Sequence, residues 1–204
     1  MDLKDTYKTI IKPSDEVLFK DKNSKFFGYA YPVTTEDEVK NHLVLLKKQH
    51  HSARHWCYAY QIGTESITYR VNDDGEPSNS AGQPIYGQIQ SFQITNVLII
   101  VIRYFGGVKL GVGGLINAYR TAAQLALENA KILEKTINRN YVITFEYKNM
   151  NKVMRIIKEK QLNIVKQVLE LNCNIEISVR KNDSQEIYSL FDKHFEIKIK
   201  KIND

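Results

Sequence analysis

The chain has 204 residues, of which 43% are hydrophobic and 25% charged, and its formal net charge is +6 at pH 7. This composition supports a sizeable core and excludes an intrinsically disordered chain, and the length allows one large or two small domains. The longest strongly apolar run, Val97–Ile102, is too short to cross a bilayer. The two cysteines, Cys57 and Cys173, form neither a disulfide framework nor a zinc pattern. With an N-terminus that does not resemble a signal peptide, these features predict a cytoplasmic protein without membrane association.

Residues 1–135 read as one mixed domain. The elements predicted in chain order are a hairpin (Val17–Lys20 and Phe26–Val33), a helix after the capping box Thr35–Glu38, strands Trp56–Ile62 and Ser66–Asn72, a short helix Ile85–Phe92, strand Val97–Ile102 and helix Leu115–Lys131. Strands outnumber helices, which favours an α+β domain with the helices on one face of the sheet.

A basic, glycine-rich loop lies between strand Val97–Ile102 and the last helix of this domain. Its glycines are Gly106, Gly107, Gly111, Gly113 and Gly114. Arg103 and Lys109 supply positive charge, and Arg120 follows in the helix. Such a combination is typical of an anion site, because glycines let backbone N–H groups converge at a helix N-terminus. The same glycines also suit a tight turn without a ligand, and the spacing matches neither a Walker loop nor a dinucleotide fingerprint.

Aromatic residues flank this loop. Tyr104, Phe105 and Tyr119 are candidates for stacking on a base. The alternative is that Phe105 packs under the loop and that Tyr119 lies on the core face of the helix.

A second chemically dense loop precedes the short helix. Asp73, Asp74 and Glu76 place three carboxylates before Pro77, and Ser80 follows. Such a cluster would suit Mg²⁺, although Asp-Asp-Gly-Glu-Pro is also strong turn chemistry. The predicted strand at Trp56 argues against a shared metal site of His51 and His55. His55 is a candidate general base, with a hydrogen bond to the backbone as the alternative, and Cys57 is expected to be a buried small hydrophobe.

Residues 136–204 read as a second domain, with the boundary near Glu134–Asn140. The predicted elements are a strand around Tyr141–Tyr147, a helix with Asn149 as N-cap, strands Asn163–Leu169 and Cys173–Arg180, a helix that starts at Asp183 and a strand Phe195–Ile199. This order, βαββαβ, is that of a ferredoxin-like domain.

The second domain does not carry the signals of a base-reading sheet. RNA-recognition sheets stack bases on exposed aromatic residues. The outward positions of the third strand are instead Asn174, Glu176, Ser178 and Arg180. The last strand carries Lys198 and Lys200, which are typical of a sheet edge protected against aggregation. These features favour a packing or protein-docking role for the second domain.

Three motifs give the chain a strong resemblance to the YigZ/IMPACT family. They are Ala53–Tyr60 (Ala-Arg-His-Trp-Cys-Tyr-Ala-Tyr), Asp73–Pro77 with Ala81–Pro84, and Arg103–Gly111 with Gly113–Leu115 and Ala118–Arg120. The resemblance covers residues 14–130 closely and the βαββαβ part by arrangement. Small departures are Asn79-Ser80 in place of Gly-Thr, Ile102 in place of Thr, and Asn117 at a position that is often basic.

The resemblance implies a fold and a cellular context. The first domain would take the two-layer fold of a ribosomal small-subunit protein domain, domain IV of elongation factor G and small-molecule kinases; the second would resemble domain V of elongation factor G. Eukaryotic members regulate translation in the stress response to amino-acid starvation, by competing for an activator of a kinase, whereas bacterial members have no settled activity. The chain shows no obvious partner-binding domain of the eukaryotic type ahead of these motifs, so that role does not transfer directly.

The leading interpretation is a translation-associated regulatory or nucleic-acid-binding protein that contacts RNA, the ribosome or a phosphate-bearing ligand. The ligand side would comprise Arg103, Tyr104, Gly106, Gly107, Lys109, Gly111, Gly113, Gly114 and Arg120. The opposite rim would comprise His55, Asp73, Asp74, Glu76 and Ser80. One rival is a magnesium-dependent phosphotransferase or hydrolase, which the lack of a complete nucleophile–base–orienter set disfavours; the other is a protein-interaction adaptor. The sequence does not fix the oligomeric state.

Overall fold

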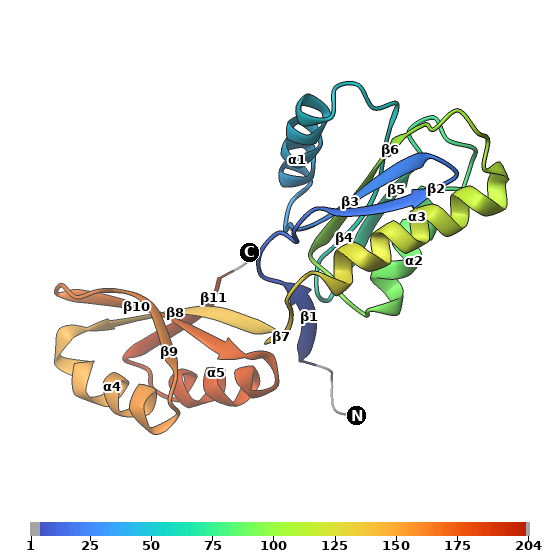
Figure 1. The fold of residues 1–204 in the computed structure, drawn as a ribbon. Helices are drawn as coiled ribbons and strands as arrows, with labels where there is room; N and C mark the ends of the chain where they lie inside the picture. Colours follow the sequence, from blue (N-terminus) through green and yellow to red (C-terminus); the bar gives the residue numbers. More distant parts are fainter. Residues whose placement is uncertain (1–4, 203–204) are drawn as a thin grey trace. The chain divides into compact units, whose positions relative to one another are not determined.

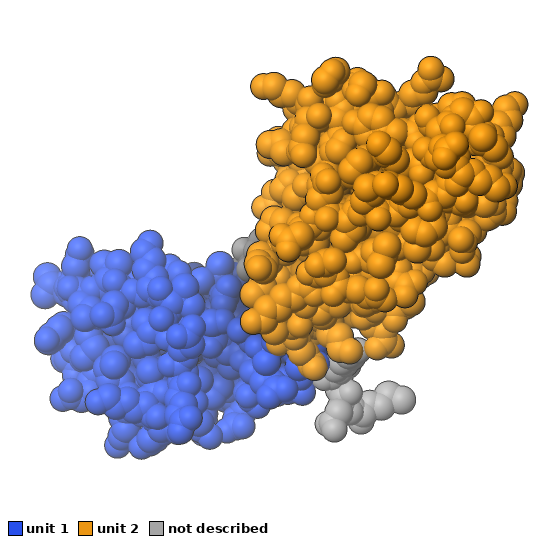
Figure 2. Space-filling model, in the orientation of Figure 1, with its two compact units in different colours: residues 1–6, 136–204 blue, residues 7–135 orange. Residues whose placement is uncertain are grey.

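The computed structural model describes residues 5–202, which form two compact units (Figure 2). One unit comprises Tyr7–Lys135, and the other comprises residues 136–202 together with Asp5 and Thr6. None of the helices in residues 5–202 combines the length and apolar character that a membrane crossing requires.

The unit of residues 7–135 is built on a five-stranded antiparallel sheet (Figure 1). Its strands, in the spatial order β2-β3-β6-β4-β5, are β2 (Val17–Asp21), β3 (Ser24–Pro32), β6 (Val97–Tyr104), β4 (His55–Ile62) and β5 (Thr68–Asn72). Its helices are α1 (Glu36–Gln49), α2 (Gly82–Ser91) and α3 (Gly111–Glu128).

The central strand β6 is buried on both sides. Its residues Val97, Ile99 and Val101 belong to the core under α2 and α3, whereas the alternate residues Leu98, Ile100 and Ile102 belong to a second core under α1. The expectation that all helices share one face therefore holds for α2 and α3 but is wrong for α1. An uninterrupted apolar strand is what two covered faces require.

Helix α1 begins as the sequence predicts. The Thr35 side chain accepts a hydrogen bond from the Glu38 backbone N–H at 3.2 Å, and the Glu38 carboxylate accepts one from the Thr35 N–H at 3.2 Å. This reciprocal capping box satisfies two N–H groups that the first turn leaves unpaired. Val39 and Leu46 then bury the inner face of the helix.

Helix α3 and a small second sheet differ from the prediction. The helix starts at Gly111, four residues earlier than expected, so that Gly111, Gly113 and Gly114 lie in its first turn. It ends at Glu128, and the chain then forms β7 (Ile132–Thr136), which pairs with β1 (Thr6–Ile10). Neither strand of this pair was predicted.

The second unit has the predicted ferredoxin-like topology. Its elements are β8 (Asn138–Glu146), α4 (Met150–Glu159), β9 (Asn163–Val168), β10 (Asn172–Arg180), α5 (Ser184–Asp192) and β11 (Ile197–Lys201), with the sheet order β11-β8-β10-β9. The expected caps Asn149 and Asp183 make no side-chain cap bond. Each ends a short 3₁₀ turn, so the chain is already helical where α4 and α5 begin.

This second sheet has one apolar and one polar face. Ile143, Ile175 and Ile177 are buried in the core with α4 and α5. On the other face, the Thr144 hydroxyl lies 2.7 Å from the Asn174 side-chain oxygen, to which it donates a hydrogen bond. The outward positions of β10 are therefore polar, as the strand alternation predicts.

Candidate functional site

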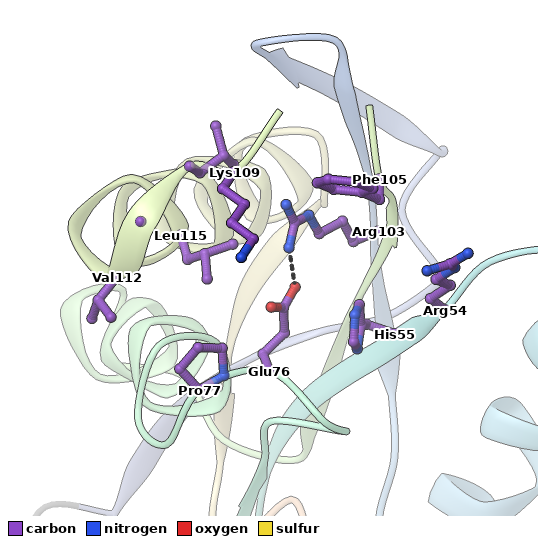
Figure 3. A pocket seen from close by; sticks show the side chains of 11 residues that line it. Arg54, His55, Glu76, Pro77, Arg103, Phe105, Lys109, Val112 and Leu115 are labelled. Atoms are coloured by element: carbon purple, nitrogen blue, oxygen red, sulfur yellow. Dashed lines mark hydrogen bonds and ion pairs between the residues drawn. The ribbon is translucent and has the colours of Figure 1, made fainter. Parts of the chain in front are cut away.

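A pocket of about 450 Å³ lies beside the first turn of α3 (Figure 3). It is enclosed by the start of β4, the loop that precedes α2, the end of β6 and the glycine-rich loop. The lining residues are Arg54, His55, Glu76, Pro77, Arg103, Phe105, Lys109, Leu110, Gly111, Val112 and Leu115. The fold thus brings together five of the predicted site residues: Arg103, Lys109, Gly111, His55 and Glu76.

A buried ion pair forms one wall of the pocket. Arg103 Nη1 lies 2.7 Å from Glu76 Oε1, and the two side chains are only 7% and 4% exposed. The Tyr119 hydroxyl donates a second hydrogen bond to the same oxygen at 2.8 Å. The guanidinium also lies over the rings of Phe26 and Phe105, at 5.6 and 5.4 Å from their centroids. Arg103 is therefore fixed in position, which suits a residue that orients a ligand.

The pocket carries an excess of positive charge. Arg54 and Lys109 are both exposed and add two cations, while Arg103 and Glu76 cancel each other. Figure 3 shows the Lys109 side chain directed toward the Arg103–Glu76 pair. In addition, Arg103 Nε is buried and has no hydrogen-bond partner within the described residues. These donors and charges favour an anionic ligand.

The first turn of α3 adds backbone donors at the same place. Leu110 precedes the helix but makes no side-chain cap bond, and the first turn contains no acidic residue. Gly111 has a φ of +75°, a conformation that glycine adopts without strain. The first N–H groups of a helix lack intrahelical partners and carry the positive end of the helix dipole. An uncapped start beside Lys109 is thus a fitting place for a phosphate.

His55 stands on the opposite wall and is anchored by the backbone. Its Nδ1 lies 2.8 Å from the Asp74 carbonyl oxygen. A carbonyl only accepts hydrogen bonds, so in the neutral ring the proton sits on Nδ1 and Nε2 keeps its lone pair. The structure therefore shows the predicted backbone bond, and it leaves one ring nitrogen available as an acceptor.

Asp73 supports the loop rather than the pocket. Its Oδ1 accepts hydrogen bonds from the backbone N–H groups of Ala81 at 2.9 Å and Gly82 at 2.8 Å, and its Oδ2 accepts one from Asn79 at 2.9 Å. One carboxylate thus ties the loop to the start of α2. Asp73 is absent from the pocket lining.

Asp74 and Ser80 also serve the loop. Asp74 Oδ2 accepts a hydrogen bond from the Trp56 N–H at 2.8 Å, and the buried Ser80 hydroxyl donates to the Pro77 carbonyl at 2.6 Å. The carboxylates of Asp73, Asp74 and Glu76 therefore serve different donors. Within residues 5–202 no three His, Cys, Asp or Glu side chains converge as metal ligands, so the geometry gives no support to the magnesium prediction.

The remaining predicted ligand residues lie outside the pocket lining. Tyr104 points to the other face of the sheet, where its hydroxyl lies 3.0 Å from His50 Nδ1. Gly106 packs against the β2–β3 turn, because a Cβ there would lie 2.1 Å from the Asn23 backbone. Arg120 is exposed on α3. Gly107, Gly113 and Gly114 shape the loop and the first turn.

The sequence reading missed part of the pocket wall. The lining also includes Arg54, which directly precedes His55, and the apolar residues Leu110, Val112 and Leu115, none of which the sequence pattern predicts as site residues. One feature of the sequence indicates this apolar wall: large apolar residues stand in a loop and in the first turn of a helix, where polar residues are usual. Tyr119, by contrast, is fully buried, as the packing alternative predicted.

Cys57 is a core residue. It is fully buried, its thiol donates to the Asp73 carbonyl at 3.0 Å, and burial raises the pKa of the thiol far above its usual range. Since Cys173 is also fully buried, we expect a thiol reagent such as Ellman's reagent to modify neither cysteine in the native protein and both in urea. Rapid native-state modification of one cysteine would contradict this placement.

Comparisons with known proteins agree with the fold. The Impact N-terminal domain model matches residues 22–127. The IMPACT family member YvyE of Bacillus subtilis is 33% identical over 156 residues, which cover 76% of the chain and 71% of that relative. An IMPACT family member of Haemophilus influenzae is 29% identical over 171 residues, or 82% of the chain and 83% of the relative.

A solved structure extends the likeness of the fold to both units. The crystal structure of a hypothetical protein matches with a TM-score of 0.71 and 22% identity, and the match covers 99% of this chain and 100% of that one. From the domain match and the YvyE relationship together, we conclude that the chain belongs to the IMPACT family.

Proposed function

We propose that the protein is a translation-associated binding protein that holds a phosphate group of RNA in the pocket beside α3. The observation that carries the proposal is the meeting of Lys109, the fixed Arg103 and an uncapped helix start in one cavity. The family resemblance supplies the translational context, because its eukaryotic members regulate translation. The chain's excess of basic residues, 29 against 23 acidic ones, also suits a polyanionic partner.

A binding role needs no reactive group. The pocket lining contains no serine, threonine or cysteine that could act as a nucleophile, and Cys57 is fully buried. The proposal therefore rests on charge and shape alone. A protein-interaction adaptor, in which these residues only maintain the loops, predicts that Lys109 is dispensable for RNA contact, so one variant separates the two functions.

We expect the purified protein to co-sediment with ribosomes in a salt-sensitive manner, and Lys109→Glu to weaken this binding about tenfold or more. A charge-assisted contact contributes about 1.5–3 kcal/mol, and releasing counterions makes phosphate binding fall with salt. The measurement is the bound fraction across a salt series.

The matched control is Lys48→Glu. Lys48 is exposed on α1 and does not line the pocket, so this substitution makes the same charge change at another place. Equal losses in the two variants, or no binding by the wild type at low salt, would contradict the proposal. A thermal unfolding curve of each variant checks that the fold is intact.

A further inference from the structure

The pocket has two chemically different ends. Lys109, Arg103 and the start of α3 offer only hydrogen-bond donors and positive charge. The His55 ring stands across from Lys109, on the other side of the Arg103–Glu76 pair (Figure 3). Its Nε2 is an acceptor in the neutral ring, because the Asp74 carbonyl holds the proton on Nδ1. A ligand that satisfies both ends must carry an anionic group and a separate hydrogen-bond donor.

Apolar side chains also line the pocket, on either side of the Arg103–Glu76 pair. Phe105 and Val112 are 43% and 54% exposed although both are large apolar residues, and Leu110 and Leu115 line the pocket with them. Exposed apolar side chains gathered at a cavity indicate a binding surface. The Arg103 guanidinium lies 5.4 Å from the centroid of the Phe105 ring, and an exposed aromatic ring that lines a pocket suits stacking by a flat ring.

We propose that this pocket takes a single 5′-phosphorylated ribonucleotide: its phosphate on Lys109 and the start of α3, its base against Phe105, and its ribose 2′-hydroxyl donating to His55 Nε2. This inference rests on the proposed function and names the ligand more closely. A cavity of about 450 Å³ is in the range of small-ligand sites, which suits one nucleotide and hence the end of an RNA chain.

The proposal predicts selectivity for ribose over deoxyribose. The 2′-hydroxyl is the group by which proteins distinguish RNA from DNA. Deoxyribose leaves the His55 acceptor without a partner inside the pocket, and an unsatisfied polar group costs about 1–3 kcal/mol. We therefore expect the wild type to bind RNA about tenfold more tightly than DNA of the same base sequence.

The experiment uses the full chain and fluorescence anisotropy. The probes are a 5′-phosphorylated six-nucleotide RNA, the DNA with identical bases, and the RNA with 2′-O-methyl groups. The methylated probe removes the donor without changing the protein, so the test does not depend on how a variant folds. We expect the DNA and the methylated RNA to bind about equally, and both about tenfold more weakly than the RNA.

The protein-side variant is His55→Phe, and His51→Phe is its control because His51 is exposed and absent from the pocket lining. The first variant is expected to lose the preference for RNA, and the second to keep it. Equal binding of RNA and DNA by the wild type, with Lys109→Glu weakening both, would overturn the ribose assignment while leaving the phosphate pocket intact. Failure of every nucleic-acid probe to bind would overturn both.

Uridine 5′-monophosphate as a competitor identifies the source of the nucleotide. If uridine 5′-monophosphate binds as tightly as the RNA, the result supports the ribonucleotide pocket and shows that a free ribonucleotide is enough to fill it. If uridine 5′-monophosphate binds more weakly than the RNA but more tightly than deoxyuridine 5′-monophosphate, the result supports the end of an RNA chain as the ligand. Equal competition by the two monophosphates would contradict recognition of the ribose.

Discussion

Glu76→Ala is expected to lower the free energy of unfolding of the 7–135 unit by about 3–5 kcal/mol, because it leaves the Arg103 guanidinium buried without its counter-charge. Both side chains are almost fully enclosed, and the same carboxylate oxygen also accepts the Tyr119 hydroxyl. Urea unfolding followed by fluorescence measures the loss. Trp56 is the only tryptophan in the chain and lies in this unit, so its signal reports on this unit.

The double variant Glu76→Leu with Arg103→Met tests whether the loss of stability comes from the unpaired buried charge of Arg103 or only from lost packing contacts. Replacing both partners by apolar residues of similar size removes the unpaired charge, so we expect part of the lost stability to return; the rest stays lost because the buried Tyr119 hydroxyl no longer has the Glu76 carboxylate as its acceptor. Glu134→Ala, at an exposed carboxylate, is the matched control and should change stability by no more than about 0.5 kcal/mol. A Glu76→Ala loss as small as that of the control would refute the structural role of the pair.

Asp73→Ala is expected to lower the free energy of unfolding by about 3 kcal/mol, which is the largest expected loss after that of Glu76→Ala. The substitution leaves three backbone N–H groups, those of Asn79, Ala81 and Gly82, without their acceptor. Hydrogen bonds to a charged group contribute about 1.5–3 kcal/mol each, but solvent can reach part of the freed loop. The same tryptophan-monitored urea titration provides the measurement.

Asp73→Asn refines this prediction. Asparagine keeps one side-chain oxygen, which can still accept from Ala81 and Gly82 at the start of α2, so an intermediate loss is expected. Asp15→Ala removes an exposed carboxylate from the same unit and serves as the control. If Asp73→Ala instead left stability unchanged but abolished ligand binding, the carboxylate would belong to the site and not to the loop.

Local signals in the sequence predicted much of the fold. The Thr35–Glu38 capping box and the alternating pattern of β10 depend on neighbouring residues, and both are present in the structure. The placement of α1 could not be predicted, since an all-apolar β6 does not say which helix covers which face. The pair β1 and β7 escaped prediction because each strand is five residues long and its partner lies more than a hundred residues away.

For the candidate site, the sequence pattern predicts which loops carry the polar side chains, and parts of these loops line one pocket, but it does not predict which contact each side chain makes. The carboxylates of Asp73 and Glu76 look alike in a linear chain. Only the fold shows that one accepts N–H groups of its own loop, while the other reaches Arg103. An acidic residue that caps a loop and one that pairs with a distant cation carry the same local signal, so their roles depend on contacts that residue spacing does not encode.

The packing of Gly106 against the Asn23 backbone has a consequence for how this family can diverge. A Cβ at Gly106 has no room, whereas one at Gly113 would meet nothing within 4 Å. A relative with this fold needs glycine at the first position, but it can carry alanine or serine at the second without a steric clash. Glycine at position 106 is therefore a requirement of the fold, whereas the fold itself leaves position 113 free to vary.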